Sequence, residues 1–310
     1  MPRVTDMAFG SSLEGAIVID MTMNINDEQL AYRRTGSGQP LVLVHASISD
    51  MRSWEPVESL LADRFDVLNY SRRFSYPNRP IDPGVDDQLE VHVRDLIALI
   101  EVQDLGPVHL LGNSSGAFVS LLVADQRPDL VRSLSLEEPP VVSMFIQTLP
   151  PKPAEMLKLL VTAPGAAVAF AKFGAGTMGP TIKAFQQGND DAALDAFARG
   201  VLGAEVYANV SAARRQQMRD NLAPHRSTLL GAGLPVFTPA QAKALTVPTQ
   251  LIRGANTPHF QRRINQRLAA LIPGARDDVV SGASHLVHED NPSAVASVVR
   301  EFVDDLRNVA

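Results

Sequence analysis

The sequence Val108-His109-Leu110-Leu111-Gly112-Asn113-Ser114-Ser115-Gly116 carries the strongest structural signal in this chain. Its first four residues form a largely apolar run typical of a buried strand, and the next five place Ser114 between two glycines. This spacing is typical of a sharp strand-to-helix turn, where a side chain at either glycine would have no room. The pattern predicts that Ser114 is exposed at the edge of a sheet as a nucleophile, with the N–H of Ser115 available to an oxyanion.

The composition points to a large α/β domain, with or without an inserted subdomain, because 45% of the 310 residues are hydrophobic. A net charge of -6 and the lack of a Lys/Arg-rich run argue against nucleic acid or a membrane surface as the partner, and favour a small molecule. The absence of cysteine excludes disulfides, zinc–thiolate sites and cysteine nucleophiles. Without an apolar leader or a long apolar run, we expect a cytoplasmic protein, and the sequence leaves a homodimer open.

Strand-like runs alternate with helical patterns in the first half of the chain. The expected strands are 41–45, 67–70, 108–111 and 131–136, and the expected helices are 53–62, 88–103 and 115–126. Such alternation predicts a parallel sheet with crossover helices. Before it we expect a two-strand entry, 16–24 and 29–34, joined at Asn26-Asp27, and a loosely held segment over residues 1–15.

The pattern changes between Val141 and Leu245, where alanines are frequent and no clear strand occurs. Helical stretches at 154–162, 191–202 and 212–221 predict an inserted helical cap over residues 141–245. We therefore expect the core to consist of residues 1–140 and 246–310. In the second part, strands are expected at 249–253 and 276–280, with a helix at 261–271 and a last helix that begins at Asn291-Pro292.

Two loops are placed to complete a catalytic site around Ser114. The segment His45-Ala46-Ser47 follows one strand and can direct a backbone N–H of Ala46 or Ser47 at the same oxyanion, while His45 itself is expected to pack within the loop. His285 follows the last strand and can accept a proton from a serine at the sheet edge. His288, three residues further along, is the alternative base.

The acid that would orient this histidine is displaced in the sequence. The turn after the strand 249–253 contains Asn256 and Thr257, neither of which can carry a negative charge. The strand 131–136 instead ends at Glu137-Glu138-Pro139-Pro140, at the carboxyl edge where α/β sheets bind ligands. Alternation along a strand lets only one of these carboxylates face the histidine, and we choose Glu138 because the two prolines hold the chain extended just past it.

The ordered set Ser114, Glu138 and His285, with the His45-Ala46-Ser47 loop and a helical insertion, resembles the α/β-hydrolase fold from about Gln29 onward. The resemblance implies a mostly parallel eight-stranded sheet flanked by helices, with a helical cap. It also implies a catalytic triad of these three residues and an oxyanion hole formed by Ala46, Ser47 and Ser115. A Glu after strand six resembles the arrangement of zearalenone lactonases and, for its position alone, of some haloalkane dehalogenases, whose nucleophile is Asp. No metal or organic cofactor is implied.

The predicted cap contains apolar side chains that we expect to bind the substrate, namely Met144, Phe145, Phe170 and Phe173. The alternative is that these residues form the core of the cap itself. We predict an esterase or lactonase that forms an acyl-enzyme and prefers a hydrophobic ester or lactone to short, charged esters. Two other readings stay open: hydrolysis of a carbon–carbon bond in a β-diketone or ring-cleavage product, and a ligand-binding sensor with negligible turnover.

Overall fold

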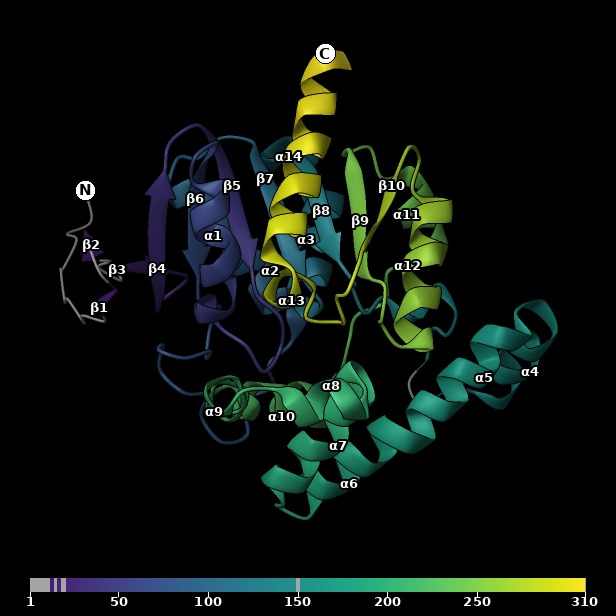
Figure 1. Cartoon of the computed structure of the whole chain (residues 1–310). Helices are drawn as coiled ribbons and strands as arrows, with labels where there is room; N and C mark the ends of the chain where they lie inside the picture. Colours follow the sequence, from purple (N-terminus) through teal and green to yellow (C-terminus); the bar gives the residue numbers. More distant parts are fainter. Residues whose placement is uncertain (1–11, 14–15, 18–20, 149–150, 310) are drawn as a thin grey trace.

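The computed structural model describes residues 12–13, 16–17, 21–148 and 151–309 (Figure 1). Its main sheet has eight strands in the order β10-β9-β8-β7-β5-β6-β4-β3. Strand β4 pairs antiparallel with β3 and β6, and the other five pairs are parallel. This is the mostly parallel eight-stranded sheet that the resemblance implied.

The strands lie within two residues of the expected positions, except that the expected strand 16–24 corresponds to β3 only in its second part. Their bounds are β3 (Met21–Ile25), β4 (Glu28–Gly36), β5 (Gln39–Val44), β6 (Phe65–Tyr70), β7 (Val108–Asn113), β8 (Val131–Glu137), β9 (Thr249–Gly254) and β10 (Arg276–Val280). The expected turn at Asn26-Asp27 joins β3 to β4, and both residues have positive φ. The expectation of a loose segment over residues 1–15 falls, apart from β1 (Ser12–Leu13), outside the described residues; β1 pairs with β2 (Ala16–Ile17).

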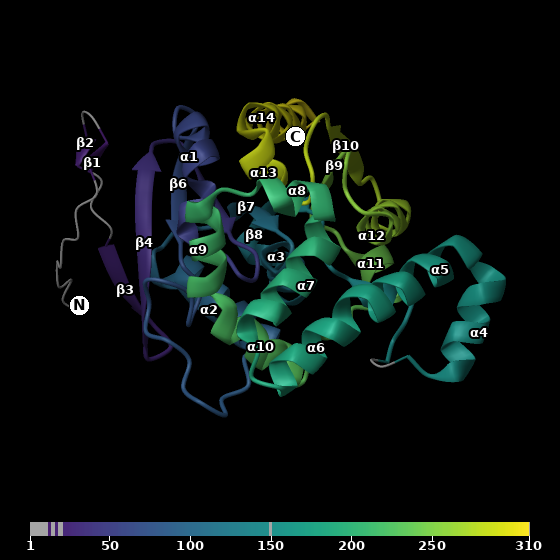
Figure 2. The ribbon, with the colours of Figure 1, turned by 60° about the horizontal axis from the view of Figure 1, so that its bottom comes forward.

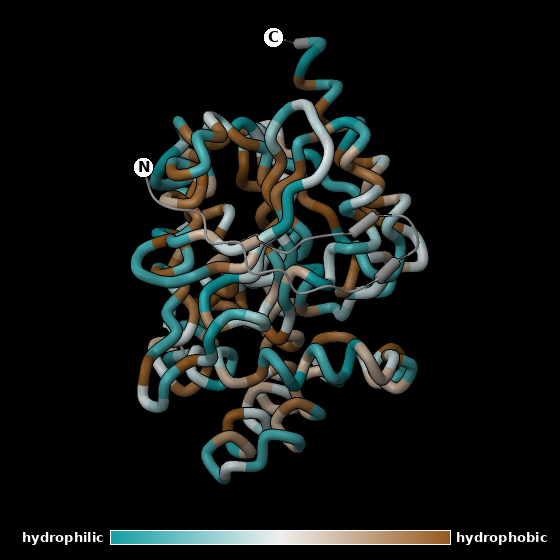
Figure 3. Tube along the Cα trace, turned by 90° about the vertical axis from the view of Figure 1, so that its left-hand side faces the viewer, coloured by the Kyte–Doolittle hydropathy of each residue, from teal (hydrophilic) through white to brown (hydrophobic). Residues whose placement is uncertain are grey.

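Helices cover both faces of the sheet (Figure 1), and hydrophobic stretches of the chain run through the middle of the molecule (Figure 3). The buried apolar residues that pack on the sheet form two clusters, one on each face. Along β5, Leu41 and Leu43 pack with α1 (Glu55–Leu61) and α14 (Pro292–Val309), whereas Val42 and Val44 pack with the helices of the other face. Those helices are α2 (Leu89–Val102), α3 (Ser115–Gln126) and α12 (His259–Leu271). Within the described ranges, no helix is both long and apolar enough to cross a membrane.

The segment between β8 and β9 is helical and lies beyond the carboxyl ends of the parallel strands (Figures 1 and 2). After the short turn η3 (Val142–Met144) come α4 (Pro153–Thr162), α5 (Pro164–Phe173), the π-helical segment Gly174–Met178, α6 (Gly179–Gln186), α7 (Asp190–Leu202), α8 (Ala204–Asn209), α9 (Ala212–Asp220), α10 (Leu222–Leu230) and α11 (Pro239–Ala244). Helices α6 to α10 share a small apolar core that also receives Ile48 and Leu286 from loops of the sheet. Helix α11 instead packs against α12.

A buried carboxylate joins the helical segment to the sheet. Asp50 is fully buried, caps the short turn η1 (Met51–Trp54) and accepts two hydrogen bonds from Arg52. It also accepts hydrogen bonds from Gln217 at 2.9 Å and Asn221 at 2.6 Å, both in the helical segment. Because a buried charge needs such partners, the contacts fix the helices over the sheet edge.

His109 on β7 is a buried histidine without a role at the sheet edge. Its Nδ1 lies 2.7 Å from Oγ of Ser133, and its Nε2 lies 3.1 Å from Oε1 of Gln39. Burial lowers the pKa of His109 to about 4. The folded chain therefore holds this ring neutral where an unfolded chain protonates it.

We predict that the chain loses stability as the pH falls from 6.5 to 4, because the unfolded state takes up more protons than the folded state in this interval. For His109 the loss amounts to about 3 kcal/mol. Urea unfolding at a series of pH values measures it, and the variant His109→Gln should show a shallower decline. An equally steep decline in wild type and variant would contradict the prediction.

Candidate active site

Ser114 stands between β7 and α3 in a strained backbone conformation, with φ 50° and ψ -119°. A non-glycine residue with such angles is costly and persists only where the surroundings enforce it. Its N–H donates to the carbonyl oxygen of Glu137 at 2.8 Å, and its carbonyl accepts from Phe118 at 3.0 Å. This is the geometry of a nucleophile elbow, in which the turn projects the half-buried serine from the sheet edge.

Both flanking glycines are required by close backbone contacts. A Cβ on Gly116 would lie 2.1 Å from the carbonyl oxygen of Val44, and one on Gly112 would lie 2.7 Å from Cα of Ala117. Neither neighbour can move without displacing a strand or a helix. The sequence pattern therefore reflects the packing of α3 against the end of β5.

Three backbone N–H groups near Ser114 have no acceptor among the described residues: those of Ala46, Ser47 and Ser115. Ser115 is the first residue of α3, so its N–H lies at the positive end of the helix dipole. Donors arranged in this way can stabilise an oxyanion. The structure thus leaves unpaired the N–H groups that the sequence analysis assigned to an oxyanion hole.

His45 holds the loop that carries two of these donors. Its Nδ1 donates to the carbonyl oxygen of Ala46 at 2.8 Å, and its Nε2 accepts from the N–H of Arg72 at 2.8 Å. Burial, and secondarily the nearby Arg72, hold the pKa of His45 well below its usual range, so the ring is neutral at pH 7. His45 is a packing residue of the loop, as expected.

Glu138 and His285 form a buried hydrogen-bonded pair. Nδ1 of His285 lies 2.6 Å from Oε2 of Glu138. The carboxylate also accepts from the N–H of Gly254 at 2.9 Å and from Oγ1 of Thr257 at 2.6 Å. The turn after β9, which lacks an acid, thus supplies donors to the acid at the end of β8.

The backbone of Glu138 differs from the expected one. Instead of being held extended by the following prolines, Glu138 has φ 48°, and Gln261 on α12 donates to its carbonyl oxygen at 2.6 Å. The residue therefore begins a turn immediately after β8, which ends at Glu137. This turn directs the carboxylate toward β9 and the His285 loop.

A second pair lies beside the first. Nδ1 of His288 lies 2.6 Å from Oε2 of Glu137, and the ring stacks on Trp54 with centroids 3.7 Å apart. His288 is 1% exposed and Glu137 is fully buried, whereas His285 is 5% exposed. Nε2 of His288 is buried without a hydrogen-bond partner among the described residues, so of these two histidines His285 is the better candidate to meet a substrate.

No hydrogen bond joins the side chains of Ser114 and His285 in the described part of the chain. Among the residues described, neither Oγ of Ser114 nor Nε2 of His285 makes a hydrogen bond. Asn113, which precedes the serine, nevertheless donates to the carbonyl oxygen of His285 at 3.4 Å and so links the two loops. Catalytic hydrogen bonds are often long without substrate and tighten when it binds.

The four apolar residues expected to bind substrate pack elsewhere. Phe173 stacks on Phe260 of α12 at 3.9 Å, and Phe170 meets the same ring edge-on at 5.3 Å. Phe145 packs on Phe170 at 5.4 Å, and Met144 is 4% exposed within the same apolar cluster. The structure thus places them in the core between the helical segment and α12, so they correspond neither to the expected substrate contacts nor to the alternative, the core of the cap itself.

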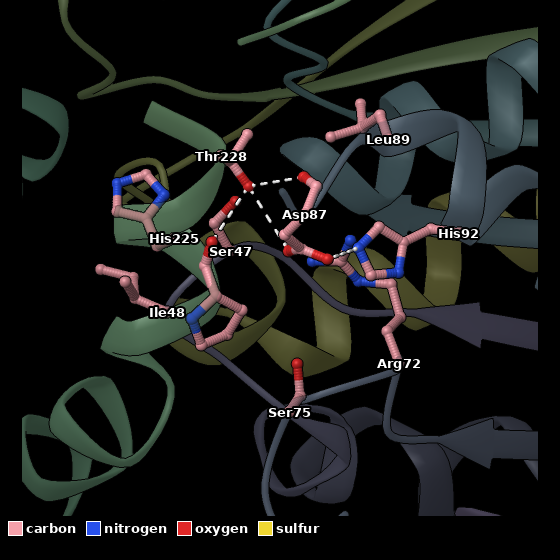
Figure 4. A pocket seen from close by; sticks show the side chains of 10 residues that line it. Ser47, Ile48, Arg72, Ser75, Asp87, Leu89, His92, His225 and Thr228 are labelled. Atoms are coloured by element: carbon pink, nitrogen blue, oxygen red, sulfur yellow. Dashed lines mark hydrogen bonds and ion pairs between the residues drawn. The ribbon is translucent and has the colours of Figure 1, made fainter. Parts of the chain in front are cut away.

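The pocket beside the oxyanion loop is small and polar (Figure 4). Its free volume is about 10 Å³, and it is lined by Ser47, Ile48, Arg72, Ser75, Asp87, Leu89, His92, Pro224, His225 and Thr228. Sequence reasoning missed Arg72, His92 and His225, since none belongs to a motif. The position of Arg72 just after β6, next to the strand that carries His45, was the available signal. Across the described parts of the chain, no group of His, Asp and Glu could hold a metal ion.

A model of the alpha/beta hydrolase family matches residues 41–298. The chain belongs to this family. It is 25% identical to the 2-(acetamidomethylene)succinate hydrolase of Mesorhizobium japonicum over 92% of this chain and 95% of that protein. It is 28% identical to the (E)-2-((N-methylformamido)methylene)succinate hydrolase of Acinetobacter baylyi over 38% of this chain, and this match spans only 45% of that relative.

Solved structures of the family have the same fold. An α/β hydrolase from Sphaerobacter thermophilus matches with a TM-score of 0.66 and 26% identity, over 91% of this chain and all of that one. Family membership agrees with the sheet order and the elbow. The α/β-hydrolase identity that the sequence resemblance implied is thus confirmed, and the protein is a hydrolase.

Replacing Gly116 with Ala should destabilise the fold by more than about 2 kcal/mol, because its Cβ would overlap the carbonyl oxygens of Val44 and His45. Denaturant unfolding measures the effect. Gly174→Ala is the matched control, since nothing lies within 4 Å of its added Cβ and its φ is helical. Equal stability of the two variants would contradict the prediction.

Glu138→Gln should lower kcat by about three to four orders of magnitude, because a neutral amide cannot stabilise the imidazolium of His285. Steady-state kinetics on any turned-over ester measure it. Glu137→Gln makes the same chemical change one residue away and should mainly lower stability, since its partner His288 is enclosed. A larger fall in kcat for Glu137→Gln would assign the catalytic pair to Glu137 and His288 instead.

Proposed function

We propose that this α/β hydrolase is a serine hydrolase that cleaves an ester or lactone of a small molecule through an acyl-enzyme. The observation that carries the proposal is the strained Ser114, which shares the sheet edge with unpaired backbone donors and with the His285–Glu138 pair. These are the nucleophile, oxyanion donors, base and orienting acid of acyl transfer.

In the proposed reaction, Oγ of Ser114 attacks the substrate carbonyl while Nε2 of His285 accepts the hydroxyl proton. Glu138 holds the proton on Nδ1 of the ring and stabilises the imidazolium that forms. The N–H groups of Ser115 and of the Ala46-Ser47 loop bind the oxyanion. His285 then protonates the departing alkoxide, and a water activated by the same ring releases the acid and restores Ser114.

The relatives support a small-molecule substrate. Two are named as hydrolases of substituted methylenesuccinates, which are dicarboxylic acids. Such substrates are polar, unlike the hydrophobic ester expected from the apolar residues of the helical segment. The polar lining of the pocket beside the oxyanion loop agrees with this difference.

A fluorophosphonate should label one residue stoichiometrically, and peptide mass spectrometry should place the label on Ser114. Labelling should be lost in Ser114→Ala, greatly slowed in His285→Ala and retained in Ser115→Ala, because only the N–H of Ser115 is used. Ser114→Ala and the double variant with His285→Ala should lose similar activity, since the residues act as a unit.

An activated ester should give a burst equal to one acyl group per active site, whereas a sensor would give neither burst nor turnover. A panel of esters, lactones and β-diketones, ranked by kcat/KM, then separates ester or lactone hydrolysis from carbon–carbon cleavage. Full labelling of Ser114→Ala, or a label on another residue, would contradict the proposed nucleophile.

A further inference from the structure

Arg72 is a buried cation that forms no ion pair with any carboxylate in the described part of the chain. Its side chain lies at the end of β6, is 5% exposed and takes part in none of the ion pairs found among the described residues. Nη2 donates to the carbonyl oxygen of Ala46 at 3.0 Å and to Oγ of Ser115 at 3.1 Å, whereas Nε is buried without a partner. A buried charge left in this state is costly unless an anion completes it.

The neighbouring Arg73, in contrast, is paired with carboxylates of the chain. Its guanidinium binds both oxygens of Asp95, at 2.7 and 2.8 Å, and approaches Glu28 at 3.4 Å. Two successive arginines at one strand end are thus treated differently. Arg73 is neutralised by the chain, whereas Arg72 is directed at the oxyanion loop and the pocket.

The pocket at Arg72 is built for a small polar group. Its free volume of about 10 Å³ admits one water-sized atom, which suits a carboxylate oxygen but not an alkyl chain. His225 also lines it and has no hydrogen bond on either ring nitrogen within the described residues. Burial lowers the pKa of His225 to about 4, so a neutral ring with one N–H donor faces this space at pH 7.

Asp87 is the one carboxylate in the pocket wall, and its charge attracts that of Arg72 at longer range without forming an ion pair. Oδ1 of Asp87 lies 3.0 Å from Nε2 of His92, and its Oδ2 is 3.4 Å from Oγ1 of Thr228 (Figure 4). Asp87 and Arg72 do not form an ion pair with each other. The guanidinium is therefore left for a ligand.

We propose that Arg72 binds a carboxylate of the substrate, next to the scissile carbonyl, and so determines specificity for anionic esters or lactones. The inference rests on the proposed function, because the N–H of Ser115 is an oxyanion donor while its Oγ touches Arg72. If that N–H binds the substrate carbonyl, a carboxylate that is separated from this carbonyl by one to a few bonds lies within reach of the guanidinium. Arginine suits this role because its planar donors match a carboxylate.

The test compares neutral and anionic twins of one ester. Monoethyl malonate, succinate and glutarate are each paired with the ester in which a carboxamide replaces the carboxylate, and ethanol release gives kcat/KM. At one spacing the wild type should prefer the anion by at least tenfold. In Arg72→Met this ratio should fall at least tenfold, to about one, and Arg72→Lys should retain part of it.

Arg73→Met is the matched control, since it removes the same charge from the adjacent position but not from the pocket. Its ratio should equal that of the wild type. If Arg72→Met lowers both twins equally, Arg72 only braces the loop, and the proposal is overturned. The proposal is also overturned if the wild type hydrolyses the anionic and the neutral ester equally well for malonate, succinate and glutarate. This result needs no variant.

Fluorophosphonate labelling of the wild type separates the two proposals. Labelling of Ser114 together with a flat ratio rejects the carboxylate subsite and leaves the serine hydrolase standing. Failure to label Ser114 rejects both.

Discussion

The positive φ of Ser114 is the constraint on which the rest of the site depends. The turn exists only because α3 approaches β5 so closely that Gly116 has no space for a Cβ. The same approach brings the first N–H of α3 beside the Ala46-Ser47 loop. Nucleophile and oxyanion donors are therefore positioned by one packing contact, in the manner of strain stored at a functional site.

Glu138 supplies the carboxylate of the site from the end of β8, although the sequence analysis first sought an acid in the turn after β9. A carboxylate buried next to a histidine needs donors for its remaining lone pairs. Gly254 and Thr257 provide two of them from the turn after β9, and the approach of Gly254 to the His285 loop leaves no room for a side chain there. The end of β8 thus supplies the acid and the turn after β9 supplies hydrogen-bond donors to it. His285 still has a carboxylate partner.

Much of this arrangement was predictable from local pattern. Strand positions, the buried α3 and the turn at Asn26-Asp27 follow from periodicity and turn chemistry, which act over a few residues. The placement of Glu137 and Glu138 near the histidine loop followed from the rule that parallel strands end at one edge, whereas the choice of Glu138 rested on an extended backbone that the structure does not have. The short helices α5, α6, α8, α10 and α11 did not follow from local pattern, because glycine, proline and alanine there give weak periodicity.

The packing partners of individual side chains were less predictable from the sequence than the strands and helices. Met144 and the three phenylalanines satisfied the requirements of an apolar pocket and of a core equally well, and only the position of Phe260 on α12 decides between them. Arg72 and Arg73 look alike in sequence, yet their distinction depends on Asp95 and Glu28, which lie on other elements. Long-range pairing of charges is not encoded in local pattern.

The buried charges at the carboxyl edge share a common logic. Each carboxylate of the consecutive pair Glu137 and Glu138 receives one histidine of the pair His285 and His288, because the turn at Glu138 sends the two side chains to different places. Asp50 likewise is satisfied by the side chains of three residues, Arg52, Gln217 and Asn221. An unpaired buried charge destabilises a protein strongly, because the loss of its hydration is not compensated. A stable sheet edge therefore requires a partner for each of its buried charges. Against this background the guanidinium of Arg72, which forms no ion pair with the described residues, is an exception, and it lies beside Ala46 and Ser115.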